Sequence, residues 1–584
     1  MACGLLVAIH MVGVPYRHSG RTWPERMQWT MLVVALVGAL GMASGCGTGG
    51  AGGDDTIIDP GPDGGGPLPV DAGPDGPPPF AFGRCGADRA PLPRLTEDRR
   101  VYAQDALDVW TAHVTLDDLD AFAAVNAGVL GATVPVHWSE GDFAAGDATA
   151  PNATLQIRGG FSRFNVQKNY KVKLDDAAGR WRNQDEINLN KHMSETTRIR
   201  NKLSFDLFQT VPDFTSMRTH FVHLFVNDED YGLYTWIEEG DKHFLASHGL
   251  DPDGQLYKPV SFHFQRIDEE EAEDPAVLDT IIEAKANPDP GHAKLRRMLD
   301  ALNDPSQPIS TVLDRYFDRD NVYTWAAVNI LVNDIDVRTQ NFYLYSPSTC
   351  DGWYLLPWDY DGAWDFYAQL DGVDGIRERW ERGLNNYWPM NLFARLFTDP
   401  ASAAAIDAKV RALAATVITD ADIAQRIARY RELVLPYLSA MPDQGHLPGV
   451  WSGAPPAQVA AVWDREAERL HTTPSRFLAE YDEVRERPMP VFMATQQTAG
   501  GTQFRWDLSL DPQGDPIVYD VQVSRTPAFA PGDLVTQQLG LTGHTVTIPG
   551  LASGTYYWRV IIRDTAHADA WQLPYDPYEM VTIP

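Results

Sequence analysis

The sequence is poor in cysteine and in basic residues. Only four of its 584 residues are cysteines, and none has the spacing of a CxxC or Cys/His zinc motif, so a structural zinc site is not expected. Lysine and arginine number 48 against 79 acidic residues, which gives a formal net charge of -31. Such a surface repels phosphate backbones, and this argues against nucleic acid as a partner and against passive attraction to anionic membranes.

The N-terminal apolar run is short. Residues 31–42 are apolar, too few to span a bilayer, and they follow the basic residues Arg21 and Arg26. Small residues then lead to Cys46, as in a lipobox, where the cysteine thiol is acylated and becomes the new N-terminus; Ala43 stands where leucine is usual. We predict an exported lipoprotein at the cell envelope or surface, with the lipid on Cys46 as its link to the membrane. The alternative is an ordinary signal peptide cut nearby.

Composition divides the remaining chain. Residues 47–83 are rich in Gly, Pro and Asp and are typical of a flexible tether. The chain as a whole is 44% hydrophobic and 11% aromatic, which is globular, and it is too long for one core. We predict a signal peptide at 1–46, the tether, a domain at 84–487 and a second domain at 488–584. In an exported chain Cys85 and Cys350 are candidates for a disulfide, with two free thiols as the alternative.

Hydrophobic periodicity predicts an α+β chain, β-rich first and then mainly helical. The expected elements of the long domain are strands at 154–158 and 170–174, a helix at 197–210, a hairpin at 219–238, helices within 275–335, a strand–turn–strand at 342–358 and helices within 389–483. Short strands at 504–507, 517–524, 545–548 and 556–562 predict a C-terminal all-β sandwich. Residues 551–557 resemble the E–F corner of a fibronectin type III domain, with Tyr557 as its tyrosine corner and Trp506 as its core tryptophan.

An acidic motif carries the strongest chemical signal. Asp336 and Asn341 are five positions apart, and a predicted strand–turn–strand separates them from Asp359 and Asp361. Phosphoryl transfer needs a carboxylate that orients the acceptor hydroxyl and an amide plus a carboxylate that hold Mg²⁺. Protein kinases place these groups in an Asp-x-x-x-x-Asn loop and in an aspartate beyond a short hairpin. The spacing here is the same.

Several further motifs occur in a fixed order around this one. They are Arg158-Gly-Gly-Phe-Ser162, Lys168-Asn-Tyr-Lys-Val-Lys173, Arg200-Asn-Lys-Leu203, Tyr231-Gly-Leu-Tyr234 with Glu238, Asp336 to Asn341, and Pro357-Trp-Asp-Tyr-Asp361. In this order and spacing, over residues 100 to 485, the chain resembles the CotH family of atypical kinase-like proteins. The resemblance implies an atypical protein-kinase-like domain with a β-rich N-lobe and a mainly helical C-lobe.

The resemblance also implies roles for the acidic motif. Asp336 would be the catalytic base or the group that orients the hydroxyl. Asn341 and Asp359 would hold Mg²⁺ or Mn²⁺. Asp361 would be either a second metal ligand or a structural hydrogen-bond acceptor.

The same resemblance implies a lysine that reaches the phosphates of ATP. Lys173 ends a hydrophobic–x–Lys alternation and is the first choice, with Lys168 as the alternative. Arg158 would also face phosphate. For the glutamate that pairs with the lysine, Glu195 and Glu238 are the candidates.

The predicted function is an exported kinase that transfers the γ-phosphoryl group of ATP to Ser or Thr of envelope or extracellular proteins. The chain lacks the G-x-G-x-x-G loop of conventional kinases and has only Gly159-Gly160. The main alternative is a catalytically inactive, kinase-like surface adhesin or polysaccharide-binding lipoprotein. A kinase of small molecules or sugars is a third reading.

Overall fold

The computed structural model describes residues 108–145, 150–160, 162–366, 369, 386–567 and 569–583. The predicted signal peptide, the tether, Cys46 and Cys85 lie outside these residues. Among the residues described, no helix has both the length and the apolar character needed to cross a membrane.

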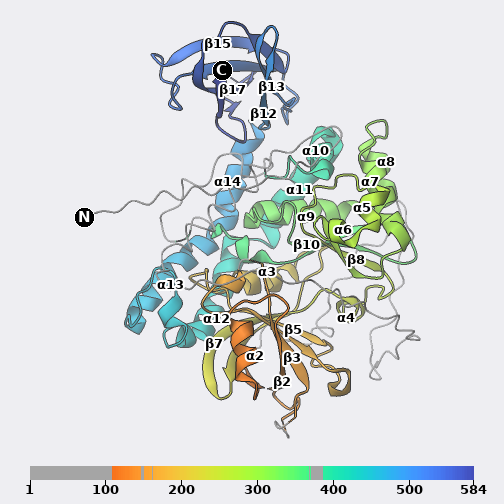
Figure 1. The fold of residues 1–584 in the computed structure, drawn as a ribbon, viewed down its shortest axis with the longest axis vertical. Coiled ribbons are helices and arrows are strands. Elements are labelled where there is room, and N and C mark those ends of the chain that lie inside the picture. The colour runs from red at the N-terminus through yellow and green to blue at the C-terminus, as the bar shows by residue number, and fades with distance from the viewer. Residues whose placement is uncertain are drawn as a thin grey trace. The chain divides into compact units, whose positions relative to one another are not determined.

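The first part of the described chain forms a closed barrel of seven strands (Figure 1). The order is β1-β2-β3-β4-β5-β7-β6, and β1 pairs with β6 in parallel to close it. The strands are β1 Trp110–Thr115, β2 Thr133–Glu140, β3 Ala153–Ile157, β4 Tyr170–Leu174, β5 Glu186–Asn190, β6 Thr219–Val226 and β7 Glu229–Ile237. The predicted strands and hairpin are confirmed. Asn227 and Asp228 both have positive φ, as the two-residue turn of a twisted hairpin requires.

A four-stranded antiparallel sheet follows, in the order β11-β10-β8-β9. Its strands are β8 Gln255–Pro259, β9 Ile282–Ala286, β10 Phe342–Ser346 and β11 Tyr354–Pro357. The strand–turn–strand predicted at 342–358 is therefore confirmed. Strand β9 lies in a stretch that is predicted to be mainly helical. It is a strand because pairing with β8 overrides the helix propensity of Glu283, Ala284 and Lys285.

Helices make up most of the rest of the long domain (Figure 1). They are α2 Leu119–Asn126, α3 Arg200–Phe208, α4 Lys242–Ser247, α5 Glu269–Glu273, α6 Pro275–Leu278, α7 Ala293–Leu302, α8 Ile309–Tyr316, α9 Arg319–Val332, α10 Asn391–Thr398, α11 Pro400–Thr416, α12 Asp420–Leu438, α13 Pro456–His471 and α14 Thr473–Arg485. Helix α9 is buried on nearly every side and packs against α11 and α14. It ends directly before the acidic motif, so a helix fixed in the core positions that motif.

The C-terminal residues form two antiparallel sheets around one core. One sheet has the order β12-β13-β16; the other has the order β15-β14-β17-β18, with β19 also paired to β17. The strands are β12 Met493–Thr498, β13 Gly501–Trp506, β14 Ile517–Ser524, β15 Leu534–Leu541, β16 Thr545–Ile548, β17 Gly554–Asp564, β18 Trp571–Gln572 and β19 Glu579–Ile583. Trp506 is in their shared core, together with Phe504 and Trp558.

The tyrosine of the predicted corner is one position earlier than expected. The hydroxyl of Tyr556 donates a hydrogen bond to the carbonyl of Ala552 at 3.0 Å, and Tyr556 packs in the core. Tyr557 lies on the other face of β17, half-buried against Tyr578. The prediction for Tyr557 is wrong. Successive side chains point to opposite faces of a strand, and because Tyr556 and Trp558 face the core, Tyr557 faces away from it.

Candidate active site

The end of α9 directs the chain into a buried acidic loop. Asn333 takes a left-handed conformation as the C-cap, and its N–H bonds back to the carbonyls of Asn329 and Ile330. The next side chain, Asp334, is fully buried. Its Oδ1 accepts the backbone N–H of Asp336 at 3.0 Å, while its buried Oδ2 receives no hydrogen bond from the described residues. The loop thus carries an uncompensated carboxylate beside Asp336.

Two amides hold the carboxylate of Asp336. Gln340 Nε2 donates to Oδ1 at 3.0 Å and Asn341 Nδ2 donates to Oδ2 at 2.8 Å. Because the Asn341 nitrogen faces Asp336, its carbonyl oxygen remains as the atom that can bind a cation. Sequence reasoning expected Asp336 and Asn341 in one site, and the structure places them in direct contact.

The second pair of aspartates reaches the same end of the sheet. Strands β10 and β11 are antiparallel, and Phe342 lies opposite Pro357, so Asn341 before β10 and Asp359 after β11 emerge at one edge. The loop after β11 packs on Asp336, since a Cβ on Gly362 would lie 3.0 Å from the Asp336 Cβ. Asp361 is 47% exposed, and its Oδ2 lies 3.8 Å from Nδ1 of the buried His192.

Helix α3 fixes the position of this loop, and sequence reasoning gave its residues no role. Asn201 Oδ1 accepts the N–H of Tyr360 at 2.7 Å, and Asn201 Nδ2 lies 3.4 Å from Asp359 Oδ1. Arg200 Nε donates to the carbonyl of Ala363 at 3.1 Å. The Arg-Asn-Lys-Leu motif therefore supports the loop that carries Asp359.

The carboxylates repel one another. Burial raises the pKa of Asp336 to about 7, and the charges of Asp361 and Asp359 add to the effect. Burial and the charge of Asp361 also raise the pKa of Asp359 to about 6, against the opposing charges of Arg158 and His192. Burial raises the pKa of Asp334 well above its usual range. A divalent cation would relieve this repulsion.

The donor set fits Mg²⁺ or Mn²⁺. Asn341, Asp359 and Asp361 offer only oxygen ligands, which these hard ions prefer. Closer triads of candidate ligands among the described residues lie elsewhere, at Asp185/Asp241/His243 and Asp515/Asp564/His567. The ligands of the acidic loop are more widely spaced than those of the two triads. Mg²⁺ tolerates this spacing because it usually binds through one or two carboxylates together with substrate phosphates and water.

Two basic side chains, Arg158 and Lys258, lie close to the acidic loop. Arg158, directly after β3, donates a hydrogen bond to Asn190, and its guanidinium lies 5.8 Å from the ring centroid of Trp358. Arg158 is the first of the groups whose charge lowers the pKa of Asp359. Lys258 of β8 is also close enough for its pKa to respond to Asp359 and Arg158, although burial is the main cause of its lowered pKa.

A lysine–glutamate pair, of which the glutamate is buried and the lysine partly exposed, lies next to Arg158. Lys171 Nζ is 2.5 Å from Glu186 Oε2 and 3.3 Å from Glu239 Oε2. Burial pushes the pKa of Glu239 upward, but Lys171, Lys285 and Arg158 outweigh it and lower the pKa to about 2. Asn188 Nδ2 donates to Glu239 Oε2 at 2.6 Å and fixes the carboxylate. Glu239 is therefore ionised and oriented toward Lys171.

The lysines chosen from the sequence lie outside this pair. Lys173 is 64% exposed and 3.7 Å from Glu186. Lys168 Nζ donates to the carbonyl of Arg163 at 2.7 Å, and burial lowers its pKa. Lys171 and Lys173 share the outer face of β4, but only Lys171 is covered. The alternation of residues along β4 predicts which face of the strand a lysine occupies, but it does not predict which part of that face other elements cover.

Neither predicted glutamate pairs with a lysine. Glu195 Oε1 accepts hydrogen bonds from the backbone N–H groups of Ile199 and Arg200 at the start of α3. Glu238 forms a buried ion pair with Arg218 and lies 2.7 Å from His248 Nε2. The neighbouring Glu239 makes the contact instead.

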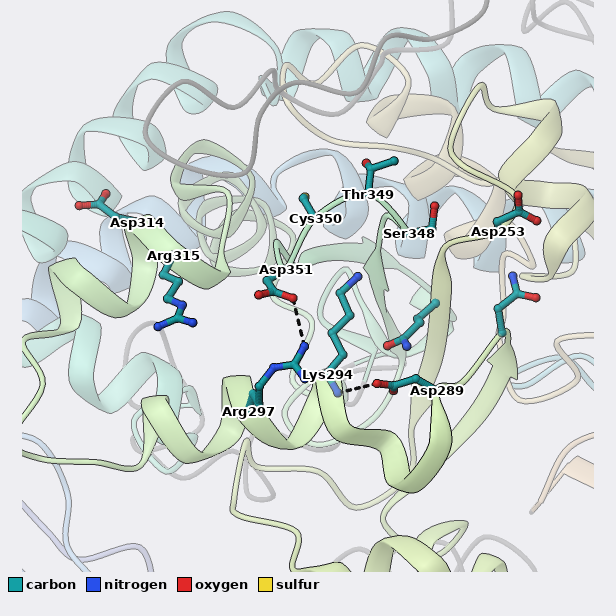
Figure 2. A pocket seen from close by; sticks show the side chains of 12 residues that line it. Asp253, Asp289, Lys294, Arg297, Asp314, Arg315, Ser348, Thr349, Cys350 and Asp351 are labelled. Atoms are coloured by element: carbon teal, nitrogen blue, oxygen red, sulfur yellow. Dashed lines mark hydrogen bonds and ion pairs between the residues drawn. The ribbon is translucent and has the colours of Figure 1, made fainter.

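A hollow of about 1020 Å³ lies apart from the acidic loop (Figure 2). Figure 2 shows Lys294 and Arg297 of α7 facing the β10–β11 turn, with Arg297 Nη2 3.2 Å from Asp351 Oδ1. Cys350, in the same turn, is disulfide-bonded. The predicted partner, Cys85, is outside the described residues. The hollow contains none of the acidic-loop residues.

The described fold is that of an α+β protein with an acidic loop at one end of the four-stranded sheet, and with Arg158 close enough for its charge to act on both Asp359 and Glu239. The model of the CotH kinase protein family matches residues 155–473, more than half of the chain, so the chain belongs to this family. All the site residues above fall within the matched range. The β-sheets at 493–583 fall outside it.

The chain is also similar to the inner spore coat protein H of Bacillus subtilis (strain 168). The two are 25% identical over 228 residues, which are 38% of this chain and 62% of the relative. The chain thus spans less than two thirds of the length of that relative.

Proposed function

We propose that the chain is an exported protein kinase that transfers the γ-phosphoryl group of ATP to a Ser or Thr hydroxyl. The observation that carries the proposal is the contact of Asp336 with Asn341 at the end of the sheet, beside Asp359, where the charge of Arg158 acts both on Asp359 and on Glu239, the partner of Lys171. Membership of the CotH kinase protein family supports it. The acceptor is a protein of the envelope or the extracellular space.

The residues have the following roles in this proposal. Lys171, held by Glu239, and Arg158 bind the phosphates of ATP; Lys171 replaces Lys173 and Lys168 because it is the covered and paired lysine. Asp336 orients the acceptor hydroxyl and takes its proton as the new O–P bond forms and the bond from the γ-phosphorus to ADP breaks. Its amide partners fix the carboxylate in place.

Asn341 and Asp359 hold Mg²⁺ or Mn²⁺, with Asp361 as a further ligand. When bound, the ion neutralises charge on the phosphate oxygens. The half-exposed position of Asp361 suits a ligand that also contacts solvent and nucleotide.

We also propose export and a fibronectin type III-like module at 488–584, after the kinase domain at 84–487. The disulfide at Cys350 supports an oxidising compartment, and the similar Bacillus protein is, by its name, a spore coat protein. Lipid on Cys46 is the proposed anchor. The strand order of the two C-terminal sheets, buried Trp506 and the Tyr556 corner support the module.

Labelled ATP tests the enzyme proposal. With Mg²⁺ or Mn²⁺, the chain should transfer label to itself or to an added Ser/Thr-rich protein, and Asp359→Ala should abolish transfer. Asp300→Ala, at a 63% exposed carboxylate, is the control and should retain it. If the chain neither binds ATP nor transfers label, the kinase proposal fails and the inactive adhesin or polysaccharide-binding protein takes its place.

A further inference from the structure

A second cluster of candidate metal ligands lies where β5 begins and β7 ends. The two strands are antiparallel, so the residues just before β5 meet those just after β7. Gln184 Oε1 accepts the N–H of Glu239 at 3.1 Å and fixes this meeting point. The cluster consists of Asp185, directly before β5, of Asp241, which caps helix α4, and of His243 in the first turn of that helix. None of the three belongs to the acidic loop.

The ligand atoms of these three side chains are close together. One carboxylate oxygen from each aspartate and one ring nitrogen of His243 lie within 4.8 Å of one another. His243 Nε2 is 3.6 Å from Asp185 Oδ2, which is longer than a hydrogen bond. Two tetrahedral ligand atoms that are each about 2.0–2.2 Å from a zinc ion lie about 3.3–3.6 Å apart. The spacing therefore suits two ligands of one ion better than it suits a hydrogen bond.

Two buried polar groups of the cluster lack a hydrogen bond. The side chain of His243 is 8% exposed, and no hydrogen bond of normal length joins its ring to the described residues. Asp185 Oδ1 is a buried oxygen that receives no hydrogen bond from the described residues. Burying a polar group without a hydrogen bond or a metal costs free energy. A metal ion between the two side chains would remove this cost.

Asp241 presents a carboxylate in a fixed orientation. Its Oδ1 accepts the backbone N–H groups of His243 and Phe244, both at 2.8 Å, while its Oδ2 receives no hydrogen bond from the described residues. Among the residues described, neither Asp185 nor Asp241 forms an ion pair with a lysine or an arginine. Burial raises the pKa of Asp241 to about 6, and the charges of Asp185 and Glu239 add to the effect. The cluster therefore has an unused oxygen ligand and a demand for positive charge.

We propose that Asp185, Asp241 and His243 form a binding site for a divalent transition-metal ion of the Zn²⁺ class, separate from the kinase site. Zinc binds carboxylate oxygen and imidazole nitrogen, and three protein ligands with a water in the fourth position are one of its usual arrangements. The ring nitrogen makes Ca²⁺ and Mg²⁺ poorer fits, because these ions prefer oxygen ligands. The bound ion would link the start of β5 to α4, beside the carboxylates that contact Lys171.

Zinc titration of the chelator-stripped full chain, in competition with a colorimetric zinc chelator, tests the site. The chain carrying Asp359→Ala is the parent of every variant, so that loss of metal at the acidic loop cannot affect the comparison. We expect the parent to bind one Zn²⁺ at this site and Asp241→Asn to weaken that binding at least tenfold. Asparagine caps a helix about as well as aspartate does, so this variant removes the charged ligand and leaves α4 in place.

A second variant and a matched control complete the test. His243→Gln should also weaken Zn²⁺ binding at least tenfold, with circular dichroism to show that the chain is folded. His223→Ala is the control, because His223 Nε2 lies 2.8 Å from Asp230 Oδ1 but belongs to neither triad of the described residues; it should bind Zn²⁺ as the parent does.

Three results would overturn the proposal. They are a parent that binds no Zn²⁺, an Asp241→Asn chain that binds it as tightly as the parent, and equal losses in His243→Gln and His223→Ala. Displacement of the ion by an equal concentration of Ca²⁺ would overturn the assignment of His243 as a ligand, because a site with a nitrogen ligand should prefer Zn²⁺.

Discussion

Asp336→Asn should make the protein more resistant to the loss of stability that accompanies a rise in pH from 5 to 7 in the absence of metal. The folded chain holds Asp336 with a pKa raised to about 7, by burial first and then by Asp361. In the unfolded chain the pKa returns to its usual value near 3.9. Between these two values the folded state therefore binds the proton that the unfolded state has lost.

The sign of the effect follows from that difference. Unfolding releases a proton in this pH window, so the free energy of unfolding falls as the pH rises from about 4 to about 7. A shift of about three pKa units corresponds to about 4 kcal/mol, of which about 2.3 kcal/mol falls between pH 5 and pH 7. Because the repulsion at Asp336 also depends on the charge states of Asp359 and Asp361, we expect the pH-dependent part of the unfolding free energy to change by about 2 kcal/mol for this single substitution.

Urea unfolding at pH 5, 6, 7 and 8 in the presence of a chelator measures this effect. The difference in unfolding free energy between Asp336→Asn and wild type should shift by about 2 kcal/mol in favour of the variant from pH 5 to pH 8. Any lost hydrogen bond to Gln340 or Asn341 adds an offset that does not depend on pH. Asp300→Asn, at an exposed carboxylate, should run parallel to wild type. Parallel curves for Asp336→Asn as well would refute the reasoning.

Three other predictions concern the packing of the acidic loop and of the C-terminal sheets. Gly362→Ala places a Cβ 3.0 Å from Asp336; we expect phosphate transfer to fall at least tenfold with a stability loss of about 1–2 kcal/mol, measured by transfer assay and urea unfolding. Asn201→Ala removes the side chain that holds the loop carrying Asp359. It should lower phosphate transfer about tenfold and raise the apparent Km for Mg²⁺. Tyr556→Phe should lower the free energy of unfolding of the C-terminal sheets by about 1 kcal/mol, whereas Tyr557→Phe should leave it nearly unchanged. Hydrogen exchange of the β17 amides measures both changes. Equal losses in the two variants would contradict the assignment of Tyr556 to the corner.

Much of the fold follows from local sequence patterns. Strands β4, β14 and β16 begin and end where alternation predicts, because apolar residues at alternate positions along each strand pack toward the core. The contact between Asp336 and Asn341 also follows from sequence, since both lie in one short loop between α9 and β10. Closure of the barrel by β1 and β6 does not, because a parallel pair far apart in sequence leaves no local signal.

The sequence does not determine which lysine and glutamate pair beside Arg158, and the reason is physical. The sequence favours Lys173, with Lys168 as the alternative, whereas the lysine that is covered on the same face of β4 is Lys171. Glu239 was missed because its neighbour Glu238 occupies the motif position and forms its own buried pair with Arg218. In both cases the outcome depends on how separate elements pack, which periodicity within one strand does not encode.

The most direct test of the account compares the two lysines of β4. Lys171→Ala and Lys173→Ala remove the same charge from the same strand face, two residues apart. Transfer of label from γ-labelled ATP with Mg²⁺ should fall at least a hundredfold in Lys171→Ala, because the phosphates lose a cation held by Glu239, and should stay within twofold of wild type in Lys173→Ala. Transfer that survives in Lys171→Ala but is lost in Lys173→Ala would contradict the proposed site.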